Sequence, residues 1–268
     1  MKRRPGAAVW VVASIGIAFL GLPVLVLVSR AVGGGTLLTA LSSPAVIDAL
    51  VLSLLTTSVS LVIVAVLGLP LAFLLARARF PGQSLVETIV DLPIVLPPSV
   101  AGLALLLLLG RRGVFGEALA GAGVSIAFTT LAVVIAQVFV AMPFFVRSAR
   151  AGLVAIDREV EDAARVDGAS ENGVLRWVSL PLAAPALAAG LVMSWARALG
   201  EFGATIMFAG SIAAITQTLP LLVYGEFQSG DLEASIAAAA VLILAAVIAL
   251  LAVRGLHWSR ALEVRAGA

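Results

Sequence analysis

Residues 49–76 read ALVLSLLTTSVSLVIVAVLGLPLAFLLA, a run that contains no charged side chain. A helix needs about 20 predominantly apolar residues to cross the hydrocarbon core of a bilayer, so a helix over this run can span a membrane with some tilt. The sequence therefore predicts an all-α, polytopic integral membrane protein built as a helical bundle. Further uncharged runs are found at 5–29, 92–110, 118–146, 177–196, 202–225 and 234–253.

The composition of the whole chain supports a membrane location. Of its 268 residues, 62% are hydrophobic and only 12% are charged, whereas average soluble domains are about 45–50% apolar and about 25% charged. A soluble domain of this size would expose large apolar patches to water, which favours aggregation. The formal net charge of +2 is too small to indicate a nucleic-acid partner.

We predict six transmembrane helices within one transmembrane domain that covers residues 1–268. The segment 209–230 is rich in turn-forming and polar residues, so we expect a loop or re-entrant segment on the outer side; a seventh helix is the alternative. The first apolar run is longer than the apolar core of a signal peptide, about 7–15 residues, so we expect it to be retained. The predicted spans lie near 8–28, 47–76, 92–110, 126–146, 182–208 and 232–253.

The distribution of basic residues sets the expected orientation, because short cytoplasmic loops are enriched in Lys and Arg. With six spans and a cytoplasmic N-terminus, only Arg30, Arg111 and Arg112 fall outside, while Arg197 stays within the membrane. A seventh span would move the basic C-terminal tail outside and weaken this bias. We therefore expect both termini to be cytoplasmic.

Several kinds of chemistry are excluded by the residue types that are missing. The chain has no Cys and one His, so disulfides, thiolate chemistry and a His-rich metal site are not expected. Its only lysine is Lys2, whereas a phosphate-binding P-loop needs a lysine after a Gly-rich turn. His257 lies beside Trp258, in what we interpret as the region where the chain leaves the membrane. We expect no catalytic site, cofactor or metal, and hence no enzyme.

The predicted cytoplasmic loop at 150–180 differs from the other loops in its charge. Charged residues are concentrated between Asp157 and Arg176. Asp157 can cap a helix, acidic residues in the first turn favour that helix, and Gly168 offers a stop. The small side chains between them leave the backbone open to close approach by another surface. A docking site for a soluble partner and an ordinary solvated loop helix both fit this pattern.

The same loop carries a family pattern. Asp162-Ala163-Ala164, then Gly168, then Val178-Ser179-Leu180-Pro181 resemble the EAA loop of permease subunits of bacterial type I ATP-binding-cassette (ABC) importers. That pattern reads E-A-A, three residues, G, nine residues, I-x-L-P, so Asp162 stands for the Glu. The resemblance implies a cytoplasmic coupling helix that docks in a groove of a separate ATPase subunit. The residues implied in this coupling are Asp162, Ala163, Ala164, Asp167, Gly168, Ala169 and Pro181.

Two further segments narrow the resemblance. Residues 92–113 (LPIVLPPSVAGLALLLLLGRRG) and 194–210 (SWARALGEFGATIMFAG), with 216–220 (TQTLP), are similar to the molybdate permease branch, whose relatives carry tungstate and sulfate. This implies a permease for molybdate in a bacterial or archaeal plasma membrane, with tungstate, sulfate or another small oxyanion as the alternative cargo. It also implies a second permease copy, two copies of an ABC ATPase subunit that hydrolyse ATP, and an external substrate-binding protein.

Arg197 and Glu201 are ionisable residues within the predicted fifth span, spaced i and i+4 on one helix face. Ionisable groups at such depth usually face a cavity and mark a pathway; a neutralising pair that holds helices together is the alternative. Gly200 and Gly203 flank Glu201, where they would permit a close backbone approach or a gate, or serve ordinary helix packing.

Pro97 and Pro98 interrupt the predicted third span. Irregular backbone at membrane depth is tolerated where protein or a water-filled cavity satisfies it, so a pore-lining segment and a simple helix kink both fit. Arg111 and Arg112, at the outer end of this span, are candidates for attracting an anion, for meeting an acidic binding protein, or for anchoring the helix at the membrane interface.

Overall fold

The computed structural model describes the backbone of residues 6–266 and the side chains of residue 6 and residues 8–251. The expected placement of Lys2, Arg3 and Arg4, and the surroundings of the His257 side chain, lie outside the described residues. The described part consists of helices and loops, without a strand. The long helices are α1 (Ala7–Gly33), α3 (Pro44–Arg77), α7 (Thr130–Val154), α10 (Leu180–Leu199) and α13 (Leu232–Ala266). The shorter ones are α2 (Thr36–Leu41), α4 (Gln83–Val95), α5 (Pro98–Leu109), α6 (Gly116–Gly121), α8 (Arg158–Val166), α9 (Glu171–Val174), the π-helix η1 (Leu175–Ser179), α11 (Gly203–Phe208) and α12 (Leu219–Ser229).

The number of membrane crossings agrees with the predicted six if one bent helix pair is counted as a span. Among the described residues, 5 helical segments are long and apolar enough to cross a membrane, and α4 with α5, bent by 117°, would supply a sixth. The bend falls at Leu96 and Pro97, because a proline cannot donate the backbone hydrogen bond that would continue the helix. The break expected from the prolines is present, but α4 already begins at Gln83, so 92–110 is not one straight span.

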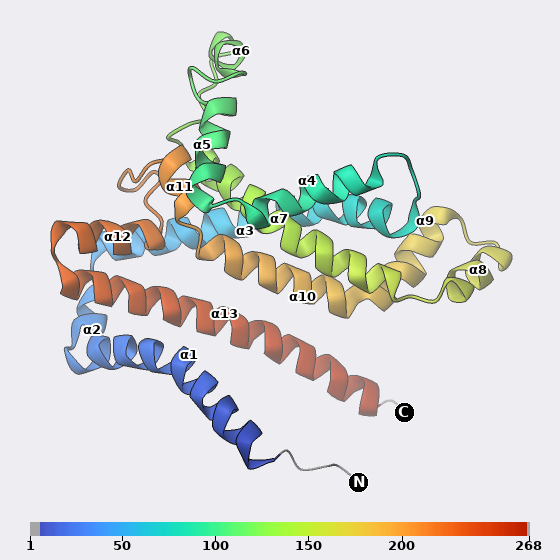
Figure 1. Ribbon diagram of the computed structural model, residues 1–268, viewed down its shortest axis with the longest axis horizontal. Helices are drawn as coiled ribbons and strands as arrows, with labels where there is room; N and C mark the ends of the chain where they lie inside the picture. Colours follow the sequence, from blue (N-terminus) through green and yellow to red (C-terminus); the bar gives the residue numbers. More distant parts are fainter. Residues whose placement is uncertain (1–5, 267–268) are drawn as a thin grey trace.

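The helices α3, α7 and α10 form the core of the bundle and lie side by side (Figure 1). Small residues bring their backbones together. A Cβ added to Gly68 of α3 would lie 2.7 Å from the ring of Phe145 on α7, and one added to Gly190 of α10 would lie 2.9 Å from Cβ of Ser148. Small residues at helix contacts are typical of membrane bundles, in which close packing drives helix association.

Buried polar side chains connect α3 with its neighbours. The amide oxygen of Gln137 on α7 accepts a hydrogen bond from the Ser60 hydroxyl (3.0 Å), and its NH2 group donates to Thr57 Oγ1 (3.3 Å). Ser53 Oγ accepts from the backbone N–H of Leu219, the first residue of α12, at 2.8 Å. Since apolar surroundings offer no water as a substitute partner, these bonds help to fix how α7 and α12 sit on α3.

Short helices mark the two ends of the bundle (Figure 1). α8 and α9 extend beyond the ends of α3 and α10, whereas α2 and α12 lie at the opposite end, and α5 and α6 project sideways. The most apolar stretch of α1 is uncovered, with 0% of it buried inside the chain. A large apolar surface therefore remains available to lipid or to another protein.

The helix in the predicted span 182–208 ends earlier than expected. α10 stops at Leu199, and α11 follows as a separate short helix after a break at Gly200–Phe202. Gly200 caps α10, and glycine is a poor helix former. The segment 209–230, expected as a loop or re-entrant segment, contains the helix α12, which has Pro220 in its first turn, where the missing N–H of proline costs nothing.

Candidate functional site

The charged loop folds as the capping residues predicted. The Asp157 carboxylate accepts a hydrogen bond from the backbone N–H of Glu159 (3.1 Å) and caps α8. At the other end, Gly168 has a φ of +91°, and the backbone N–H groups of Gly168 and Ala169 each bond a carbonyl of the last turn at 3.0 Å. A Cβ on Gly168 would meet nothing within 4 Å. Its backbone conformation, rather than a lack of space, is therefore what favours glycine here.

A buried carboxylate anchors α8 to the bundle. Glu161 Oε1 accepts a hydrogen bond from Arg77 Nη2 of α3 (2.6 Å) and another from the Ser179 hydroxyl of η1 (2.7 Å). The side chain of Glu161 is 3% exposed and that of Arg77 is 14% exposed. Glu161 is not among the residues predicted for coupling; the available signal was that Glu161 and Ala164, three residues apart, share one face of the helix.

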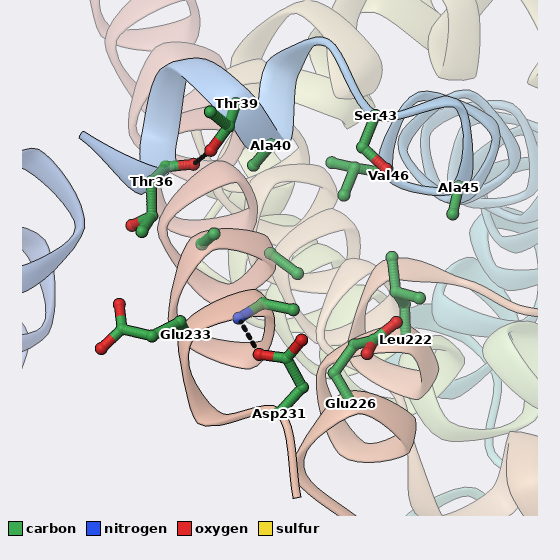
Figure 2. Close-up of a pocket in the computed structure, with 13 residues that line it drawn as sticks. Thr36, Thr39, Ala40, Ser43, Ala45, Val46, Leu222, Glu226, Asp231 and Glu233 are labelled. Carbon is green, nitrogen blue, oxygen red and sulfur yellow. Dashed lines mark hydrogen bonds between the residues drawn. The ribbon is translucent and has the colours of Figure 1, made fainter. Parts of the chain in front are cut away.

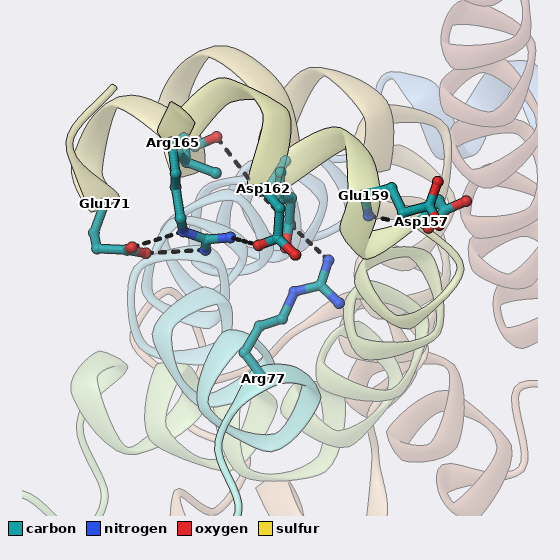
Figure 3. A network of polar contacts seen from close by, with 9 residues as sticks. Arg77, Asp157, Glu159, Asp162, Arg165 and Glu171 are labelled. Atoms are coloured by element: carbon teal, nitrogen blue, oxygen red, sulfur yellow. Dashed lines mark hydrogen bonds and ion pairs between the residues drawn. The ribbon is translucent and has the colours of Figure 1, made fainter. Parts of the chain in front are cut away.

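A second, exposed set of ion pairs joins α8 to α9 (Figure 3). The guanidinium of Arg165 donates to Asp162 at 2.7 Å and to both carboxylate oxygens of Glu171 at 2.7 and 3.1 Å. The hydrogen bond to Glu171 raises the pKa of Arg165 above its ordinary value. The Asp162 side chain is 70% exposed, and exposed pairs of this kind contribute little to stability.

Apolar side chains on this loop are also exposed. Val166, on α8 beyond the end of the bundle (Figure 1), is 87% exposed, and Trp177, in η1 just before α10, is 73% exposed. Apolar groups inside a polar rim are typical of a protein interaction site. Of the residues implied in coupling, Ala164 is half-buried and the others are exposed, namely Asp162, Ala163, Asp167, Gly168, Ala169 and Pro181.

The two helix breaks meet at one side of the bundle. A Cβ on Gly203 of α11 would lie 2.6 Å from Cβ of Pro98, and one on Gly102 of α5 would lie 2.8 Å from Cα of Ala204. The structure thus brings together Pro98 and Gly203, two of the predicted pathway residues. Gly200 is exposed and makes no such close approach. Irregular backbone within membrane-spanning segments is tolerated where protein or a water-filled cavity satisfies it, so a pore-lining segment and a simple helix kink both still fit the prolines.

Arg197 and Glu201 form an ion pair across the end of α10. Arg197 Nη1 lies 2.6 Å from Glu201 Oε2; the Glu201 side chain is 1% exposed and that of Arg197 is 29% exposed. The other oxygen of Glu201 accepts a hydrogen bond from the backbone N–H of Ala204 at 2.6 Å. Contrary to the expectation of one helix face, Glu201 therefore lies in the break and caps α11, while the Arg197 side chain stays partly exposed.

The opposite end of the molecule holds an acidic hollow of about 280 Å³ between α2, α12 and α13 (Figure 2). Glu226, Asp231 and Glu233 line it, and Asp231 caps α13 by accepting from the backbone N–H of Ala234 at 2.9 Å. Carboxylates repel an anion, so this hollow is unsuited to an oxyanion. Arg111 lines a separate hollow of about 240 Å³ beside α6.

The chain matches a known family over most of its length. Residues 68–258 match the family described as binding-protein-dependent transport system inner membrane component. The chain is 39% identical over 245 residues to the molybdenum transport system permease protein ModB of Mycobacterium tuberculosis, covering 91% of this chain and 92% of that protein. It is 37% identical over 217 residues to the sulfate transport system permease protein CysT of Escherichia coli, covering 81% and 78%.

The architecture is also found in a solved structure. A bacterial alginate ABC transporter, crystallised in complex with an alginate pentasaccharide-bound periplasmic protein, contains a chain that superposes with a TM-score of 0.73. The match covers 95% of this chain and 93% of that chain at 22% sequence identity. At this level of identity the likeness establishes a common fold.

Proposed function

Because this chain belongs to the family of binding-protein-dependent transport system inner membrane components, we propose that it is the permease subunit through which an ABC importer takes up molybdate. The chain is a multi-pass membrane protein of that family and not itself an enzyme. The relative from Mycobacterium tuberculosis supports molybdate as the cargo. The sulfate relative from Escherichia coli supports the same machine with a different oxyanion as the second candidate.

The observation that carries the proposal is the position and surface of α8. The helix stands beyond one end of the bundle, has a charged rim, and is accompanied by exposed Val166 and Trp177. An ABC ATPase subunit can dock on this surface, and two copies would serve two permease chains. When ATP closes the ATPase pair, the docked helices are pulled together and the passage opens outward.

A second copy of the chain would complete the passage. Pro97, Pro98 and Ser99 are exposed next to the place where the helix breaks meet, so a single chain leaves this region open on one side. A facing copy would enclose it and could also cover part of the apolar surface of α1. We expect an external binding protein to deliver the anion at the opposite end from α8; the alginate transporter was likewise crystallised with a periplasmic protein.

The electrical cost of moving an anion into the cell explains why such a permease needs an ATPase subunit. Molybdate carries two negative charges, and the inside of a cell is electrically negative. Entry costs about 2.3 kcal/mol per charge per 100 mV, or about 4–5 kcal/mol for both charges. Through a passive pore, the anion would leave the cell, because the negative interior repels it. Because short cytoplasmic loops are enriched in Lys and Arg, we place α8, with Arg77 at the end of α3 and Arg147 and Arg150 in the C-terminal part of α7, on the cytoplasmic side of a bacterial or archaeal plasma membrane.

The test is reconstitution of the chain with its ATPase and binding protein in vesicles that contain ATP. We expect molybdate uptake that requires both ATP and the binding protein and that persists in an excess of sulfate. Sulfate uptake that molybdate does not suppress would assign the second candidate function. If neither oxyanion, nor tungstate, is taken up in an ATP-dependent manner, the proposal is wrong.

A further inference from the structure

We propose that Glu161 is the positioning residue through which movement of α8 reaches the membrane helices, an inference that rests on the proposed function. Within Arg158–Val166, Glu161 is the buried residue, and its neighbours along the helix are exposed or half-buried. A partner that docks on α8 from outside can act on the bundle through the chain on either side of α8 and through side chains that α8 shares with the bundle. Glu161 is the buried one among these side chains.

One oxygen atom of Glu161 joins three elements of the fold. Oε1 accepts from Arg77, the last residue of α3, at 2.6 Å and from Ser179, the last residue of η1, at 2.7 Å. Ser179 leads directly into α10, and both α3 and α10 pack along α7. Displacing Glu161 therefore acts on the cytoplasmic ends of two core helices at the same time.

The burial of this connection distinguishes it from the neighbouring ion pairs of α8. Asp162 is 70% exposed, so water can replace its partner Arg165 at little cost. Arg77, by contrast, is 14% exposed, and its Nε atom is buried without a hydrogen-bond partner. Losing Glu161 would leave this guanidinium buried without a compensating charge, which proteins resist strongly. The connection to Glu161 therefore persists when α8 is pulled, whereas the pair at Asp162 can yield.

The segment that Glu161 contacts at the start of α10 is a π-helical turn. Leu175–Ser179 form a π-helix, a rare turn that often occurs at functional sites. The Ser179 hydroxyl has two acceptors within reach, Glu161 Oε1 at 2.7 Å and the carbonyl of Val174 at 3.4 Å. Ser179 can thus exchange its bond to α8 for one within its own turn. At its other end, α10 leads to Glu201 and the break that faces Pro98.

The experiment measures how much molybdate is moved per ATP hydrolysed by the complete importer in vesicles. Glu161→Gln keeps the shape and the acceptor oxygen but removes the charge that holds Arg77. Ser179→Ala leaves the ion pair in place and removes only the link to η1. We expect both variants to bind the ATPase and to continue ATP hydrolysis, while molybdate moved per ATP falls about fivefold or more in Glu161→Gln and less in Ser179→Ala.

Glu87→Gln is the matched control. It weakens a bond of similar length, from Arg150 Nη2 of α7 to Glu87 Oε1 of α4 at 2.7 Å, between side chains that are 36% and 32% exposed and do not belong to α8. Its molybdate-to-ATP ratio should equal that of the unchanged protein. An unchanged ratio in Glu161→Gln and Ser179→Ala, or an equal fall in Glu87→Gln, would overturn the inference. If Glu161→Gln does not assemble, the ratio in Ser179→Ala decides alone. Absence of ATP-dependent uptake by the unchanged protein would instead refute the proposed function.

Discussion

Gly203 and Pro98 are in direct contact across two separate helix breaks: a Cβ built on Gly203 would lie 2.6 Å from the Cβ of Pro98. Real Cβ atoms do not approach a neighbour so closely, so this contact requires a residue without a side chain. It presses the start of α11 against the start of α5. The break in α4–α5 and the break in α10–α11 are consequently held together, and a disturbance of one is transmitted to the other.

Gly203→Ala is expected to lower molybdate uptake about tenfold, because adding a methyl group to this tightly packed contact would force α5 and α11 apart, and overpacking costs about 1–3 kcal/mol. The measurement is the initial rate of uptake at equal amounts of assembled importer. Gly121→Ala is the control, since its Cβ would meet nothing within 4 Å. Full uptake by Gly203→Ala would show that the close contact is not needed.

Arg197→Ala is expected to lower both the unfolding temperature and molybdate uptake. Removing one partner of a buried ion pair costs about 3–5 kcal/mol; because the Arg197 side chain is 29% exposed, we expect the loss to lie at or below the lower end of that range. Adding Glu201→Gln removes the orphaned charge and keeps an acceptor for the Ala204 N–H, so the unfolding temperature should recover.

Uptake by this double variant separates two roles of Arg197. We expect uptake to stay low although stability is restored, because the accessible part of the guanidinium would act on the anion. Full uptake by the double variant, or by Arg197→Ala with normal assembly, would mean that the pair only holds the break together.

Gly168→Ala is expected to weaken binding of the ATPase subunit. The φ of +91° at Gly168 lies where an alanine costs roughly 1–2 kcal/mol, so the end of α8 would rearrange. Gly168→Asn should be milder, because Asn tolerates this region better. The check is the affinity of the purified permease for the ATPase, with Gly173→Ala as the control; its Cβ would make only ordinary contacts, the nearest at 3.4 Å. Native affinity in both Gly168 variants would contradict the prediction.

Thiol labelling can establish the orientation, because the chain contains no cysteine. Val166→Cys and Phe227→Cys place single thiols at opposite ends of the bundle, at positions that are 87% and 60% exposed. In intact cells, a membrane-impermeant reagent should label the cysteine at 227 and spare the one at 166 until the membrane is opened. The reverse pattern would place α8 outside and would exclude docking of a cytoplasmic ATPase.

The sequence predicted the helices better than their interruptions. Uncharged runs located the long helices because a bilayer core excludes charge over a fixed thickness. The break in α4–α5 was predictable, since Pro97 lacks the N–H that a continuing helix requires. The break after Leu199 was not, because the residues around Glu201 are mostly apolar and their pattern does not distinguish a capped end from a continuing span.

In the charged loop between α7 and α10, too, the features set by neighbouring residues were predictable from the sequence, and those set by tertiary contacts were not. The cap at Asp157 and the stop at Gly168 followed from local backbone chemistry. The role of Glu161 did not, because its burial depends on Arg77, which is 84 residues away in the chain. An acidic residue in a charged loop is normally solvated, and only the tertiary structure shows which of the two adjacent acids turns inward.

The π turn at Leu175–Ser179 takes up one residue more than an α-helical turn, so the helix after it keeps its rotational phase. Elsewhere in an α-helix, each residue corresponds to a rotation of about 100°. Deleting one residue within this turn should therefore restore an ordinary α-helical turn and leave Gly190 and Ser194 facing α7, which they now contact. A deletion between the turn and Gly190 would instead rotate both residues away from α7. Chimeras that join the loop of one relative to the helix of another can therefore differ by one residue across this turn, but not beyond it.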